Sequence, residues 1–340
     1  MLDLLAQYGL FLAKTLTWVV AIVIVVSVIA NVAHHLRGQS QDHLDVRSVN
    51  DRLRDMGATL NAELLDRAAS KAEAKARKKE EKAQQRARKH GHSDERARVF
   101  LLDFHGDLRA SQTAHLREEI SAVLQVARER DEVLLRLESE GGMVHGYGLA
   151  ASQLQRIRDR RIKLTVAVDK VAASGGYLMA CVADRIIAAP FAILGSIGVV
   201  AQLPNFNRLL KKNEIDFELH TAGQHKRTLT LFGENTEAAR TKFKEEIEDV
   251  HALFKSFVTD NRPQLQIEQV ATGEHWYGSR ALALKLVDEI KTSDDWLLER
   301  AKDCDIVEVH YRIKPRMLDR LTHSFAALRA AARADWLKLR

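Results

Sequence analysis

Val99-Phe-Leu-Leu-Asp-Phe104 opens an alternation of apolar runs and amphipathic segments that decides the fold of this chain. An amphipathic stretch at 113–128 follows, then an apolar run at 133–137, an amphipathic stretch at 147–158 and an apolar run at 162–168. Short apolar runs separated by helical patterns are typical of repeated βαβ units. The sequence therefore predicts an α/β fold built on a parallel sheet.

Upstream of this alternation, an uncharged apolar segment extends from Leu16 to Ala33 and contains Trp18. Its length is close to the roughly 20 apolar residues that cross a bilayer as a helix. It is longer than the apolar core of a typical signal peptide, and no small-residue cleavage site follows it. We expect a retained transmembrane anchor within residues 1–36.

A charge-dense stretch rich in Ala, Lys, Glu and Arg separates the anchor from the first strand. It predicts a charged helical spacer over residues 37–97, since opposite charges alternate at helical spacing. The mixed signs favour a solvated spacer over a patch for anionic lipids. The main domain is then expected at 98–300, followed by a C-terminal extension at 301–340 that ends in a basic amphipathic helix.

The composition excludes several classes of protein. With 340 residues, of which 46% are apolar, the chain can bury a sizeable core. Its two cysteines, Cys181 and Cys304, lack CxxC spacing, so we expect buried free thiols and no structural zinc. The net charge is +6, but the basic residues are mixed with acids and no aromatic stacking platform accompanies them, which argues against nucleic-acid binding.

Two segments contain the candidate chemical groups, Ala173-Ser174-Gly-Gly176 and Ala222-Gly-Gln-His-Lys226. A serine hydroxyl becomes a strong nucleophile when an imidazole or a neutral amine removes its proton. Ser174 follows the predicted strand 164–168 at the start of a helical segment, where backbone N–H groups are free. The pattern predicts Ser174 as a nucleophile and Lys226 as a candidate base.

Histidine is the rival base. His105, His145, His220 and His225 are candidates by proximity in space, and His145 is favoured because it lies three residues after a glycine pair. The histidines show no paired metal spacing beyond His90-x-His92, which lies in the charged spacer. We therefore expect no metal, and the chemistry requires no cofactor.

Five motifs occur in a fixed order along the chain. They are Glu138-Ser-Glu-Gly-Gly142, Ala173-Ser-Gly-Gly-Tyr177, Gly195-Ser-Ile-Gly-Val199, Ala222-Gly-Gln-His-Lys226, and Gly273-Glu-His-Trp-Tyr-Gly278 running on to Leu286-Val-Asp288. In this order they resemble the signal peptide peptidase family of Ser-Lys dyad serine peptidases, family S49, over residues 99–290. The whole chain resembles the SohB-like inner-membrane branch of that family. The resemblance implies a ClpP/crotonase-like fold of repeated β-β-α and βαβ units.

The resemblance also implies roles for individual residues. Ser174 would be the nucleophile, Lys226 the general base, and Ser196 a hydroxyl that positions the lysine. The backbone N–H groups of Gly142 and Gly175 are the candidate oxyanion hole, because the glycine pair lies just past the predicted strand 133–137. Full burial lowers a lysine pKa by roughly 3–5 units, which is how an amine of this kind becomes a base.

Glu140 departs from the family pattern. Family members usually carry proline before the glycine pair. Proline presets the turn, whereas glutamate does not and adds a negative charge close to the developing oxyanion. The oxyanion hole is therefore the part of the site in which this chain differs from its family.

The resemblance implies a membrane-anchored serine endopeptidase that cleaves signal-peptide remnants or membrane-associated polypeptides through an acyl-enzyme. Extended peptides would be its substrates, and a homo-oligomeric ring its assembly. Two alternatives remain, a crotonase-like acyl-CoA enzyme and a catalytically silent membrane adaptor. The expected location is the bacterial inner membrane, but the side of the membrane on which the catalytic domain lies stays open. The basic residues after the anchor favour a cytoplasmic domain, whereas the resemblance implies a periplasmic one.

Two further segments have structural predictions. The apolar stretch Ile186 to Leu203 contains Pro190 and glycines, so it predicts a pair of buried strands joined by turns. A membrane crossing there would place Ser174 and Lys226 on opposite sides of the bilayer. The apolar residues between Thr236 and Val258 recur at helical spacing and predict a packing helix.

Overall fold

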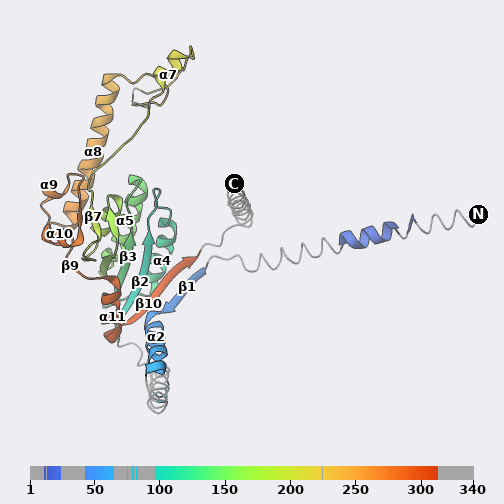
Figure 1. Ribbon diagram of the computed structural model, residues 1–340, viewed down its shortest axis with the longest axis vertical. Helices are drawn as coiled ribbons and strands as arrows, with labels where there is room; N and C mark the ends of the chain where they lie inside the picture. Colours follow the sequence, from blue (N-terminus) through green and yellow to red (C-terminus); the bar gives the residue numbers. More distant parts are fainter. Residues whose placement is uncertain are drawn as a thin grey trace, which may run out of the picture. The chain divides into compact units, whose positions relative to one another are not determined.

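The computed structural model describes residues 11, 12, 14–23, 43–64, 75, 79, 82, 96–223 and 225–312. Its centre is a seven-stranded sheet of order β1-β10-β2-β3-β4-β6-β9 (Figure 1). The strands are β1 (His43–Ser48), β2 (Arg98–His105), β3 (Glu132–Glu138), β4 (Lys163–Val168), β6 (Arg185–Ala188), β9 (Glu289–Ile290) and β10 (Asp305–Arg312). From β10 to β9 every neighbouring pair is parallel, which confirms the predicted α/β fold with a parallel sheet.

Helices pack on both faces of this sheet, which explains why its central strands are continuous apolar runs. The helices are α2 (Val49–Leu64), α4 (Thr113–Val126), α5 (Val144–Asp159) and α11 (Ser293–Asp303). Phe100 and Leu102 of β2 pack in the larger core with buried residues of α4 and α5. Val99 and Leu101 point to the opposite face, where they pack in a smaller core with Trp296 of α11.

A second sheet contains β5 (Val171–Ala173), β7 (Ile193–Gly195) and β8 (His275–Tyr277). β5 pairs parallel with β7, and β7 pairs antiparallel with β8. A single bridge between Ser139, just after β3, and Ala172 joins this sheet to the first. The strands β6 and β7 confirm the pair of strands predicted for the stretch 186–203.

Helix α8 (Glu237–Asn261) confirms the predicted helix, and its packing is confirmed at the C-terminal end, where Phe254 and Val258 pack in the larger core. Val258 is its one buried residue, and the apolar positions 243, 247, 250 and 254 are half-buried. The helix is held at its C-terminal end, where Arg158 Nη1 donates to Asn261 Oδ1 at 3.2 Å. Toward its N-terminal end α8 has no fully buried residue, and the helix leads from the sheet to α7 (Asn207–Lys212) (Figure 1).

Two strands of the main sheet lie outside the residues 98–300 expected for the domain. β10 lies between β1 and β2, and β1 completes that edge. The sequence of β1, His43-Leu-Asp-Val-Arg-Ser48, is too polar and too short for its periodicity to predict a strand. Its extended conformation depends on a partner more than 250 residues away in the chain.

Residues 14–23 form a helix whose apolar side chains, including Trp18 and Val20, are exposed. The described part of the chain contains no helix that combines the length and the apolar character needed to cross a membrane. Residues 24–33 of the expected anchor lie outside the described residues, as do most of the expected spacer and the expected helix at 317–340.

Both cysteines are free and buried, as predicted. Cys181 directly follows α6 (Gly175–Ala180), and its Sγ donates to the Leu178 carbonyl at 3.2 Å. Cys304 directly precedes β10. Burial raises the pKa of both thiols, so they remain protonated core side chains.

The Arg262→Met variant is expected to lower the free energy of unfolding by about 3 kcal/mol. Arg262 is 2% exposed, and its Nη1 and Nη2 each lie 2.8 Å from an oxygen of Asp288. Removing the guanidinium leaves a half-buried carboxylate without its counter-charge. Urea denaturation of the full chain measures the loss, with Arg280→Met as a control on an exposed arginine. Equal midpoints for the two variants would contradict the prediction.

Candidate active site

Ser174 lies between β5 and α6, in a backbone conformation that non-glycine residues rarely adopt. Its φ and ψ are 51° and −118°, so the turn is strained. The Ser174 N–H donates to the Gly195 carbonyl at 2.8 Å, and its carbonyl accepts from the Leu178 N–H at 3.0 Å. These bonds hold the half-buried side chain at a sharp turn from strand to helix, which confirms that Ser174 begins a helical segment.

The glycine pair after β3 packs directly against this turn. A Cβ on Gly141 would lie 2.8 Å from Ser174 Cβ and 2.7 Å from the Gly175 nitrogen, and Gly141 has a φ of +91°. Ser139 fixes the approach, because its N–H donates to the Val171 carbonyl and its carbonyl accepts from the Ala173 N–H, both at 2.9 Å. The two motifs at 138–142 and 173–177, which are separate in the sequence, therefore lie in contact at Ser174.

Two backbone N–H groups remain available beside Ser174. The Gly141 N–H is taken by Ser139 Oγ at 3.0 Å, and the Met143 N–H by the Leu108 carbonyl at 2.8 Å. Within the described ranges, the N–H groups of Gly142 and Gly175 donate to no acceptor. A pair of unused N–H groups flanking a serine is the arrangement that stabilises an oxyanion.

Glu140 precedes the glycine pair and is exposed. Water and salt screen an exposed charge strongly, so the negative charge acts on the neighbouring N–H groups far less than a buried carboxylate would. The glycine pair also adopts its turn without proline. The departure from the family pattern thus leaves the backbone arrangement beside Ser174 in place.

Ser196 follows β7 as Ser174 follows β5. Because Ala173 and Gly195 are register partners, the two serines leave the sheet at the same end. Ser196 also has a positive φ, 52°, and its N–H donates to the Glu274 carbonyl at 2.6 Å. The structure therefore brings Ser174, Ser196 and the glycine pair together.

Lys226 is not part of this group in a single chain. It lies on an exposed segment between α7 and α8, where its N–H donates to the Gly223 carbonyl at 3.2 Å. In the part of the molecule that is described, no hydrogen bond joins its ammonium to Ser174 or Ser196. The same holds for the four rival histidines, His105, His145, His220 and His225, which are all exposed.

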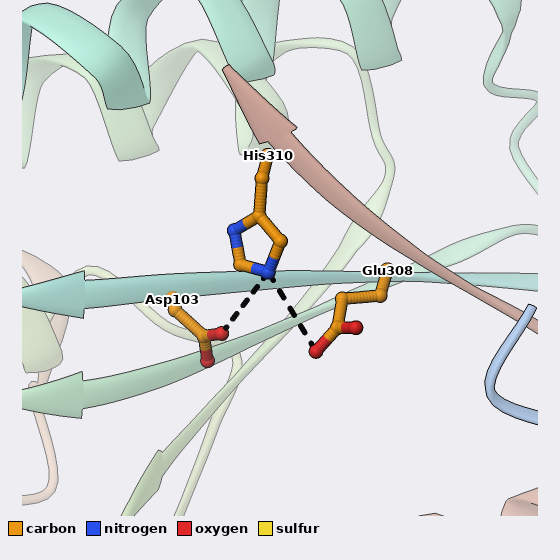
Figure 2. A group of neighbouring side chains, drawn as sticks. All are labelled: Asp103, Glu308 and His310. Atoms are coloured by element: carbon orange, nitrogen blue, oxygen red, sulfur yellow. Dashed lines mark ion pairs between the residues drawn. The ribbon is translucent and has the colours of Figure 1, made fainter. Parts of the chain in front are cut away.

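A separate cluster on the main sheet has side chains of metal-ligating type, Asp103, Glu308 and His310 (Figure 2). His310 Nε2 lies 3.6 Å from an oxygen of each carboxylate. Arg136 already neutralises this pair, since its Nη2 lies 2.7 Å from Asp103 Oδ2 and 3.2 Å from Glu308 Oε1. A divalent cation would share these oxygens with a guanidinium charge, so the cluster fits a charge network better than a metal site.

Two buried side chains beside the glycine pair, Ser139 and Tyr147, were not among the residues predicted for the site. Their hydroxyl oxygens are 2.6 Å apart. Ser139 lies inside the first motif, and Tyr147 lies in the helix that follows it. The sequence signal for Ser139 was its place two residues before the glycine pair.

Two family models match almost the whole chain. The model described as peptidase family S49 N-terminal matches residues 3–154, and the model described as peptidase family S49 matches residues 156–306. The chain belongs to peptidase family S49. This S49 chain is accordingly a serine-type peptidase, as the motifs predicted.

Named relatives agree with the family. The probable protease SohB of Haemophilus influenzae is 51% identical over 323 residues, covering 93% of this chain and 91% of the relative. The probable protease SohB of Buchnera aphidicola subsp. Schlechtendalia chinensis is 48% identical over 307 residues, covering 88% of this chain and 100% of the relative. This S49 peptidase is therefore SohB-like.

Solved structures also align with this S49 chain. The 1510-N membrane-bound stomatin-specific protease in complex with a substrate peptide is 13% identical, with a TM-score of 0.41. The alignment covers 68% of this chain and 98% of that chain.

Proposed function

We propose that this S49 peptidase is a membrane-anchored endopeptidase that cleaves extended peptides with a Ser174–Lys226 dyad. The observation that carries the proposal is the strained turn at Ser174, packed against Gly141 with the unused N–H groups of Gly142 and Gly175 beside it. A ClpP/crotonase-like fold agrees with the two sheets joined at Ser139 and with the serine at a strand-to-helix turn. Membership of a peptidase family favours peptide hydrolysis over an acyl-CoA enzyme or a silent adaptor.

The proposed reaction has two halves. Ser174 Oγ attacks the scissile carbonyl carbon while the neutral Lys226 amine takes its proton, and the N–H groups of Gly142 and Gly175 stabilise the oxyanion. The tetrahedral intermediate collapses to an acyl-enzyme as the lysine gives that proton to the leaving amine. Water then attacks the ester with the same lysine as base, which releases the acid and restores Ser174. Ser196 would orient the lysine by accepting a hydrogen bond from it.

The position of Lys226 supports an assembled rather than a single-chain site. The lysine is exposed on the segment between β7 and α8, and large apolar side chains of the same segment, including Val200 and Leu209, are exposed as well. An exposed apolar segment is a typical protein–protein contact. In a homo-oligomeric ring, this segment would bring Lys226 of one subunit to Ser174 of the next.

Anchoring at the bacterial inner membrane is part of the proposal. The helix at 14–23 exposes Leu16, Trp18 and Ile22 to more than half of their surface. Apolar side chains exposed all round a helix are covered most favourably by lipid or by other protein. Signal-peptide remnants and membrane-associated polypeptides would then be the substrates within reach.

Cleavage of an apolar fluorogenic peptide by the detergent-purified full chain tests the dyad. Ser174→Ala and Lys226→Ala are expected to abolish cleavage because they remove the nucleophile and the base. Ser152→Ala and Lys212→Ala serve as matched controls on exposed positions. Wild-type activity is expected to rise with pH, since the lysine acts as a neutral amine. Equal activity in all five proteins would overturn the proposal.

Subunit mixing tests whether the dyad is shared. Inactive Ser174→Ala and Lys226→Ala chains, coexpressed, are expected to regain part of the activity, because some interfaces then combine an intact serine with an intact lysine. Each variant coexpressed with itself is the control. Mixed assemblies without any recovery would place both residues of the dyad in one subunit.

A further inference from the structure

A chain of buried hydroxyl groups lies beneath the candidate oxyanion hole. Ser139 Oγ accepts from the Gly141 N–H at 3.0 Å and lies 2.6 Å from the Tyr147 hydroxyl. That hydroxyl donates to the Asp107 carbonyl at 2.8 Å. Ser139 is 2% exposed and Tyr147 is fully buried, so water does not compete for these bonds.

The number of hydroxyl protons fixes the direction of each hydrogen bond between Ser139, Tyr147 and the Asp107 carbonyl. The single Tyr147 proton goes to the Asp107 carbonyl, so the phenol oxygen must accept from the hydroxyl of Ser139. Ser139 Oγ therefore uses its own proton on Tyr147 and a lone pair on the Gly141 N–H. Burial raises the pKa of Tyr147, which keeps the phenol protonated and the order of donors unchanged.

The loop that contains Asp107, at the far end of this series of hydrogen bonds, is held in place as well. The Asp107 carboxylate accepts from the Ser111 N–H at 2.8 Å and from the Arg109 N–H at 3.1 Å. In the same loop the Leu108 carbonyl accepts from the Met143 N–H at 2.8 Å. The residues before and after Gly142 are therefore both tied to the loop at 106–112.

Tyr147 also touches the other side of the site. Its ring lies so close to Gly175 that a Cβ at residue 175 would overlap ring atoms Cγ and Cδ2. The same ring packs edge-on against Phe104, with the centroids 6.4 Å apart. One side chain therefore contacts the turn that holds Gly175 and, through Ser139, the loop that holds Gly142.

From this geometry we infer that Ser139 and Tyr147 are positioning residues, which hold the N–H groups of Gly142 and Gly175 at the spacing that an oxyanion requires. The inference rests on the proposed function and deepens it. These hydroxyls also satisfy two backbone groups, the Gly141 N–H and the Asp107 carbonyl, so a test of positioning needs readouts other than stability. Their bonds specify the orientation of the glycine loop, which Phe and Ala at these positions would leave undetermined.

The Tyr147→Phe variant isolates the hydroxyl, because it keeps the ring against Gly175 and Phe104. We expect kcat to fall by about 10-fold with KM unchanged, less than the roughly 100-fold to 1,000-fold loss for a missing oxyanion donor. The inhibition constant of a peptide aldehyde, whose adduct with Ser174 places an oxygen in the hole, is expected to rise by a similar factor. The concentration of active sites is measured by titration with a fluorophosphonate. A smaller folded fraction of the variant is then not mistaken for a lower kcat.

Tyr177→Phe is the matched control. Tyr177 is also fully buried, but its hydroxyl donates to the Leu286 carbonyl at 2.9 Å and has no bond to the glycine loop. This variant is expected to lose stability without changing kcat or aldehyde binding. If Tyr147→Phe and Tyr177→Phe give equal kinetics while Ser174→Ala is inactive, the inference fails and the proposed function stands.

A double-mutant cycle and hydrogen exchange complete the test. Ser139→Ala with Tyr147→Phe is expected to cost little more than either change alone, because both break one chain of bonds. Both single variants are expected to speed amide exchange across residues 140–143 relative to Tyr177→Phe, a readout that needs no substrate. Additive kinetic losses with unchanged exchange would overturn the inference. A wild type without Ser174-dependent cleavage would overturn the proposed function and the kinetic role together.

Discussion

The Gly141→Ala variant is expected to reduce kcat/KM for peptide cleavage by at least about 100-fold, the lower end of the loss for one oxyanion donor. A Cβ at residue 141 would lie 2.7 Å from the Gly175 nitrogen and 2.8 Å from Ser174 Cβ, closer than real side chains approach. The positive φ of 91° adds strain, because an L side chain rarely adopts it. The loop and the serine turn must therefore move apart. Steady-state cleavage of the fluorogenic peptide measures the loss.

Gly148→Ala is the control for this change. Gly148 lies in α5, and a methyl group added there would meet no atom within 4 Å. Alanine at this position should therefore stabilise the helix by roughly 0.5–1 kcal/mol and leave cleavage unchanged. Gly141→Ala must also remain folded, which thermal unfolding monitored by circular dichroism establishes. Full activity in a folded Gly141→Ala protein would show that the contact between the glycine loop and Ser174 is not needed for catalysis.

The Glu119→Gln variant is expected to remove a pH-dependent loss of stability of about 2.5 kcal/mol between pH 5 and pH 8. Glu119 is 2% exposed, and one of its oxygens has no hydrogen-bond partner among the residues that the structure describes. Burial, together with the charge of Asp103, raises the pKa of Glu119 from 4.5 to about 7, although the Tyr311 N–H bonded to the carboxylate opposes the shift. The contribution of Glu119 to folding is thus fully present below pH 4.5 and is lost as the pH rises through 7.

Glu118→Gln provides the matched control, since Glu118 is the exposed neighbour on the same helix and loses the same charge. Urea denaturation of the full chain at both pH values gives the free energies of unfolding. Wild type and Glu118→Gln should weaken in parallel as the pH rises, whereas Glu119→Gln should weaken less. If all three proteins show the same change between the two pH values, Glu119 titrates near its ordinary pKa.

The central strands were predictable because both faces of the sheet are covered. A strand such as β2, buried on both sides, must be apolar throughout, and that run is visible in the sequence. β1 was not predictable, because its polar residues are extended only through pairing with β10. The same limit applies to α8, where helical spacing predicts the helix but does not show how much of its apolar stripe is covered.

The candidate site also contains residues that could be predicted from the sequence and residues that could not. Ser174 and the glycine pair were predictable because glycine is required where two backbone segments come close, and such glycines stand out in a sequence. Ser139 and Tyr147 were not, since their importance lies in which hydroxyl bonds to which, and periodicity carries no information on that. The place of Lys226 relative to Ser174 depends on contacts beyond one chain, if the proposed ring forms.

The two buried thiols give the molecule built-in reporters of local opening. Cys181 directly follows α6, the helix that begins after Ser174, whereas Cys304 directly precedes β10, the strand that pairs with the edge strand β1. A small thiol reagent reaches each sulfur only when its surroundings open, so the two labelling rates compare the local stability of the nucleophile region with that of the sheet edge. The comparison needs no mutation, and substrate that orders the site should slow labelling at Cys181 alone.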